Sequence, residues 1–80
     1  MSSISQYDLV RVTRIRDSRF EGTKVFYQRH PRVGDVGTVV EVYSDPAGFE
    51  VECCAAGDGY TTWLDAMYPE ELERVSEQAV

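Results

Sequence analysis

The sequence predicts an all-β fold in which five short strands close into a small barrel. Apolar and polar residues alternate with a period of two in several short segments, which is typical of half-buried strands. Turn signals rich in glycine, proline and aspartate separate these segments. Closing such a sheet into a barrel removes exposed strand edges, so a short chain with this pattern favours closure.

The first predicted strand covers residues 8–15, where Val10 and Val12 share one face. A long connection follows over residues 16–32. It shows neither a strand period nor a helix period, yet it carries aromatic and basic side chains. Loops of this length are unusual in small domains and are often functional.

The second strand is the best defined and covers residues 36–43, after a turn at Gly34. Its alternation places Val36, Val40 and Val42 on the inner face. Gly37 interrupts an otherwise β-branched segment, which predicts either a positive φ or a close approach to a neighbouring backbone.

The remaining elements follow at short spacing. Residues 49–54 and 60–66 read as strands, separated by a predicted hairpin turn at 57–59 and preceded by the turn at 45–48. Pro69 begins a single 3-10 turn, which leads into a short last strand at 73–75. The predicted core consists of inward-facing apolar residues: Val10, Val12, Val36, Val40, Val42, Phe49, Val51, Leu64, Leu72 and Val75.

The length of 80 residues predicts one domain, at 7–75, between flexible tails at 1–6 and 76–80. The sequence shows no signal peptide and no membrane-spanning segment, so we expect a cytoplasmic protein. The two cysteines, Cys53 and Cys54, are adjacent in a predicted strand and point to opposite faces, so they are expected to be reduced thiols. We expect neither a metal nor a cofactor.

The net charge of −6 conceals a strong asymmetry along the chain. Residues 1–33 carry a charge of +4, whereas residues 34–80 carry −10. One interpretation is that the two parts neutralise each other in the fold. The other is that an acidic surface meets a basic partner.

Four sequence blocks resemble a bacterial family of small uncharacterised domains with an SH3-like barrel fold. They are Tyr7–Val12, Gly34–Tyr43, Phe49–Glu52 and Pro69–Val75. The glycine turn of the second block is also similar to that of KOW-type domains. The resemblance implies a five-stranded SH3-like barrel without assigned chemistry, and partners among toxin-like proteins. The basic, aromatic loop at 16–32 is longer than is usual for the family.

No group of residues in the sequence amounts to a catalytic site, so we expect a non-enzyme. His30 is the single histidine and precedes a proline in the basic loop, which favours a solvated loop residue over a base. Glu50 and Glu52 share a strand face at a spacing that could hold a hard cation, but a solvated outer face is the better interpretation.

Three functions remain open. The first is a protein-binding module, such as an antitoxin or immunity-type inhibitor, for a basic partner. Its predicted interface combines aromatic and acidic residues: Glu41, Tyr43, Glu50, Glu52, Trp63 and Asp65. The second is a KOW-like nucleic-acid-binding domain that uses basic residues of segment 14–32: Arg14, Arg16, Arg19, Lys24, Arg29 and Arg32. The third is a docking subunit for a redox complex.

Overall fold

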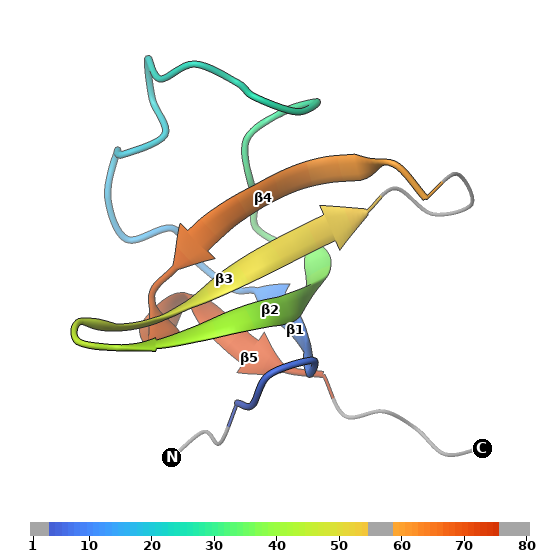
Figure 1. Ribbon diagram of the computed structural model, residues 1–80. Helices are drawn as coiled ribbons and strands as arrows, with labels where there is room; N and C mark the ends of the chain where they lie inside the picture. Colours follow the sequence, from blue (N-terminus) through green and yellow to red (C-terminus); the bar gives the residue numbers. More distant parts are fainter. Residues whose placement is uncertain (1–3, 55–58, 76–80) are drawn as a thin grey trace.

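Five antiparallel strands form one sheet in the order β4-β3-β2-β1-β5 in the computed structural model, which describes residues 4–54 and 59–75 (Figure 1). The strands are β1 (Leu9–Val12), β2 (Val36–Ser44), β3 (Ala47–Cys54), β4 (Thr61–Met67) and β5 (Leu72–Arg74). A 3-10 turn, η1 (Pro69–Glu71), precedes β5. The all-β class, the five strands and the single 3-10 turn are therefore as predicted.

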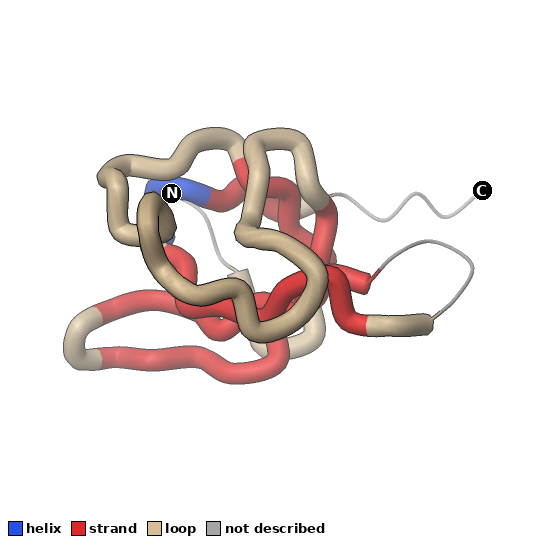
Figure 2. Tube along the Cα trace, turned by 90° about the horizontal axis from the view of Figure 1, so that it is seen from above, coloured by secondary structure: helices blue, strands red, loops and turns tan. Residues whose placement is uncertain are grey.

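The long connection between β1 and β2 is the largest irregular segment of the described chain. It lies beside β4, where the backbone N–H of Gln28 donates to the carbonyl of Thr62 at 3.0 Å. Its aromatic tip is exposed, and Phe26 retains 79% of its accessible surface. Figure 1 shows this loop above β4, and Figure 2, seen from above, shows its trace passing over the strands.

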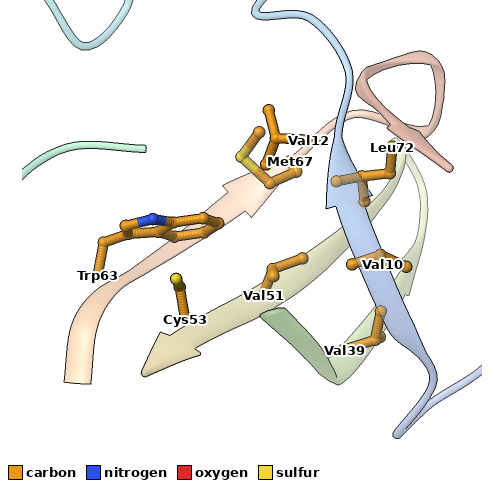
Figure 3. Close-up of a cluster of buried hydrophobic side chains, with 8 residues drawn as sticks. All are labelled: Val10, Val12, Val39, Val51, Cys53, Trp63, Met67 and Leu72. Atoms are coloured by element: carbon orange, nitrogen blue, oxygen red, sulfur yellow. The ribbon is translucent and has the colours of Figure 1, made fainter. Parts of the chain in front are cut away.

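The core lies on the inner face of the sheet and contains eight buried side chains: Val10, Val12, Val39, Val51, Cys53, Trp63, Met67 and Leu72 (Figure 3). Four of the predicted core residues are confirmed, namely Val10, Val12, Val51 and Leu72. Phe49 is half-buried and packs against the cluster. Val75 is also half-buried.

The predicted inner face of β2 is wrong before the residue Glu41, whereas Val42 lies opposite the core-packed Phe49 as expected but is not buried. Val39 is fully buried, whereas Val36 and Val42 are exposed and Val40 is half-buried. The register between β2 and β3 shifts between Val39 and Glu41, so Val40 is the extra residue of a β-bulge. Valines occupy both faces of this strand, and the bulge changes the phase of the alternation within it.

The inner face of β4 also differs from the prediction. Trp63 pairs with Cys53 across the strands and Met67 pairs with Phe49, and both Trp63 and Met67 are buried. Leu64 is half-buried and faces the other side. The register with β3 decides this orientation, because residues directly opposite each other share a face.

Other sequence expectations fall at the ends of the described segments. The predicted turn at 57–59 and the tail at 76–80 lie wholly or mostly outside the described residues. Within the predicted N-terminal tail, Ile4 packs against the core and the Gln6 side chain donates to the carbonyl of Val40 at 3.0 Å.

Gly37 is predicted to tolerate no side chain, because β2 meets the backbone of β3 there. A Cβ at this position would lie 2.7 Å from the Glu52 carbonyl oxygen and 2.8 Å from Cγ1 of Val51. We expect Gly37→Ala to lower the free energy of unfolding by about 1–3 kcal/mol through overpacking. Urea unfolding checks this, with Val36→Ala on the same strand as an exposed control. Equal stabilities of the two variants would contradict the close approach.

Candidate functional site

Ion pairs join the basic first part of the chain to the acidic second part. Arg16 contacts Glu70 at 2.7 Å, Arg19 contacts Glu71 at 2.7 Å, and Arg11 contacts Glu73 at 2.8 Å. Two further pairs are Arg29–Asp35 at 2.8 Å and Arg74–Asp8 at 3.2 Å. Much of the charge asymmetry is therefore neutralised within the fold, which was one of the two interpretations of the sequence.

Glu71 is the most deeply buried of these acids, with 0% of its surface exposed. One carboxylate oxygen accepts from the Arg16 backbone N–H at 2.8 Å and from Nη1 of Arg19 at 2.9 Å. The other accepts from Nη2 of Arg19 at 2.7 Å and from the Tyr68 backbone N–H at 2.9 Å. Burial alone would raise the pKa of Glu71, but these hydrogen bonds outweigh burial and lower it. Through these hydrogen bonds, Glu71 connects the start of the long loop to η1.

The Tyr68 ring completes this junction between the loop and η1. The guanidinium carbon of Arg16 lies 3.3 Å from the ring centroid, and that of Arg19 lies 4.8 Å away. Such cation–π stacking adds to the ion pairs and restrains the orientation of both guanidinium groups.

Trp63 is buried, with 1% of its surface exposed, and its indole N–H donates to Oδ2 of Asp35 at 2.8 Å. Asp35 also accepts from the Arg29 guanidinium, at 2.8 and 3.0 Å, and from the Arg32 backbone N–H at 2.9 Å. The predicted role of Trp63 as an exposed anchor for a partner is therefore wrong. Its ring belongs to the core, and its polar edge fixes the end of the loop before β2.

Two predicted interface carboxylates meet on the outer face of the sheet. Glu41 on β2 lies directly opposite Glu50 on β3. The Tyr43 hydroxyl donates to Oε1 of Glu50 at 2.9 Å, and this hydrogen bond and the two carboxylates raise the pKa of Tyr43. Among the described residues, no basic side chain forms an ion pair with Glu41 or Glu50. The structure therefore brings Glu41, Tyr43 and Glu50 together.

The other two predicted acids of the interface lie apart from each other. Glu52 continues along the Glu50 face, and one of its carboxylate oxygens accepts from the Thr61 hydroxyl at 2.6 Å. Asp65 pairs with Val51 and so shares the inner face of the sheet. It lines a cavity of about 310 Å³ beneath the long loop, together with Phe20, Lys24 and His30. Burial raises the pKa of Asp65.

The six basic residues of the predicted nucleic-acid surface do not act alike in the fold. Arg16, Arg19 and Arg29 are engaged by carboxylates. Arg14, Lys24 and Arg32 form no ion pair with a described residue. Carboxylates therefore already neutralise three of these six cations, so fewer unpaired positive charges remain to contact a polyanion such as RNA or DNA.

A groove of about 340 Å³ adjoins the acidic outer face, and sequence reasoning missed it. Tyr43 and Pro46 come from the β2–β3 turn region, and Ala66 and Tyr68 come from the end of β4 and the residue after it. Gly48 and Ala66 are two of its small residues, and the lining is mainly apolar. The proline and glycine of the turn were visible in the sequence, but their approach to Tyr68 depends on the sheet register.

No group of three or more metal-ligating side chains gathers within residues 4–54 and 59–75. Cys53 is buried and Cys54 is exposed, both as free thiols, and burial raises the pKa of Cys53. In the same described segments, no helix is long and apolar enough to cross a membrane.

The fold and this surface define a small antiparallel β domain with an acidic outer face beside an apolar groove. The family model described as Domain of unknown function (DUF4926) matches residues 26–74, more than half of the chain. The chain therefore belongs to this uncharacterised family. The match begins within the long loop and covers β2 to β5, while β1 lies outside it. No curated protein and no solved structure matches the chain.

Proposed function

We propose that this chain is a non-catalytic protein-binding module for a partner with a basic surface, a class that includes antitoxin and immunity-type inhibitors. The observation that carries the proposal is the direct opposition of Glu41 and Glu50 on the outer face. Like charges directly opposite each other destabilise a sheet. A cationic partner that covers both carboxylates relieves this repulsion, so the arrangement favours binding over stability.

The proposed interface keeps Glu41, Tyr43 and Glu50 of the sequence-based interface. It excludes Trp63, which is buried, and Asp65, which lies on the inner face. Tyr43 remains as its aromatic residue, since 43% of the Tyr43 surface is exposed. Aromatic rings beside carboxylates suit a contact with an apolar centre and a charged rim. The net charge of −6 adds a long-range attraction that speeds encounter with a basic partner.

We also infer that the sheet has the form of an SH3-like barrel. The strand order, the long loop after β1 and the 3-10 turn before β5 support this inference. This fold serves many functions, so the proposal rests on the surface rather than on the fold.

Neutralising the outer face is expected to weaken association with the basic partner. A pull-down from the source cell at low salt, with mass spectrometry, identifies proteins that the wild type retains and the Glu41→Gln/Glu50→Gln variant does not. With the purified partner, we expect the double variant to associate about tenfold more slowly at low salt, and its rate to depend less on salt concentration. Stopped-flow fluorescence measures both quantities.

The matched control is the Glu21→Gln/Glu70→Gln variant, which has the same net charge and changes no residue of the sheet. It should associate at close to the wild-type rate. If both double variants associated equally slowly, net charge alone would explain the slower association, and this result would contradict a defined interface at Glu41 and Glu50. Retention of RNA or DNA at physiological salt through Arg14, Lys24 and Arg32 would favour the nucleic-acid alternative instead.

A further inference from the structure

The groove beside the outer face offers an apolar subsite next to the acidic subsite formed by Glu41 and Glu50. Glu50 lies directly opposite Ala66, which lines the groove, and Tyr43 lies directly opposite Gly48, which lines it too. The Tyr43 ring therefore borders the groove while its hydroxyl contacts Glu50. Groove and carboxylates form one continuous surface across β2, β3 and β4.

The charge around the groove is negative. Asp45 lines it and forms no ion pair with a described residue. Arg19 lines it as well, but its guanidinium is held by Asp17 at 2.8 Å and by Glu71 at 2.7 Å. An occupant thus meets apolar walls with Asp45 and Glu50 beside them, and a cationic segment complements this arrangement.

We propose that the groove binds an extended segment of the basic partner, in which an apolar side chain lies next to a lysine or arginine. This inference rests on the proposed function and specifies its recognition element. The apolar side chain enters the groove between Tyr43 and Tyr68, and the cation contacts Glu50 and Glu41. Neighbouring strands lie about 4.8 Å apart and an extended chain rises about 3.3 Å per residue, so adjacent or next-adjacent residues reach both subsites. The groove volume of about 340 Å³ suits one or two side chains.

Three acetylated pentapeptides test the proposal by NMR titration of the labelled protein: Ser-Lys-Leu-Lys-Ser, Ser-Lys-Ser-Lys-Ser and Ser-Glu-Leu-Glu-Ser. We expect the first to shift the amide signals of Gly48 and Ala66 and to bind at least about fivefold more tightly than the second. The third should give no saturable shift. Ala66→Leu fills the groove without altering charge, so it should remove the advantage of leucine. Ala66→Ser is the matched control and should retain that advantage.

The two proposals fail in different ways. If leucine confers no advantage, or if Ala66→Leu leaves that advantage intact, the groove is not the apolar subsite, whereas binding through the carboxylates stands. If wild type and Glu41→Gln/Glu50→Gln bind both lysine peptides equally, the proposed function fails. Concentration-dependent shifts at Gly48 and Ala66 without peptide would show that a second copy covers the groove, and would overturn the assignment to a partner segment.

Discussion

Replacing Glu71 by alanine is expected to lower the free energy of unfolding by about 3–5 kcal/mol, because the change leaves Arg19 without its buried partner. Two backbone N–H groups, of Arg16 and Tyr68, also lose their acceptor. A domain of this length is stabilised by roughly 4–12 kcal/mol in total. The expected loss is therefore a large fraction of the total stability. Circular dichroism during urea titration measures the loss.

The neighbouring residue offers a matched control. Glu70 is exposed and contacts Arg16 at 2.7 Å on the surface. Surface ion pairs contribute about 0–1 kcal/mol, so Glu70→Ala should unfold at almost the wild-type urea concentration. A similar loss in both variants would show that Glu71 is not the buried junction between loop and η1.

The same contact predicts an acid-sensitive fold. Hydrogen bonds to the carboxylate make the pKa of Glu71 lower in the folded state than in the unfolded state. Its contribution to stability is therefore complete above the unfolded pKa and is lost as the pH falls through the folded pKa. Asp35 acts in the same direction, since hydrogen bonds from Arg29, Trp63 and Arg32 outweigh its burial and lower its pKa.

Adjacent identical residues explain why the sequence did not reveal this junction. Glu70 and Glu71 both follow Pro69, and both suit the first turn of a helix. Their fates differ because Arg19, from the long loop, reaches one of them. A contact between residues 52 positions apart leaves no local pattern in the sequence.

The strands show the same division between local and long-range information. Alternation in β3 correctly placed Val51 inside and Glu50 outside, because apolar residues occupy one face of that strand there. In β2 and β4 both faces carry apolar residues, so the alternation alone does not decide which face of the strand points into the core. The bulge in β2 and the pairing of Trp63 with Cys53 select one of the two faces, and both depend on the neighbouring strand.

Truncating Trp63 is expected to affect stability rather than binding. Trp63→Ala removes the largest side chain of the core and the indole donor to Asp35, so it should lower the free energy of unfolding by about 3–5 kcal/mol. Trp63→Phe keeps a ring but loses the hydrogen bond, so its loss should be smaller, at about 1–3 kcal/mol. Urea unfolding measures both, with Phe26→Ala in the exposed loop as a control that should change stability by less than about 0.5 kcal/mol.

The binding experiment separates the core role of Trp63 from an interface role. At a temperature where Trp63→Phe remains folded, its dissociation rate from the basic partner should match that of the wild type, because the ring does not reach the surface. Tyr43→Ala, by contrast, removes an exposed ring beside Glu50 and should speed dissociation at least about fivefold. Faster dissociation for Trp63→Phe with an unchanged rate for Tyr43→Ala would move the interface away from the outer face of β2 and β3, and toward the end of the sheet where Trp63 holds Asp35.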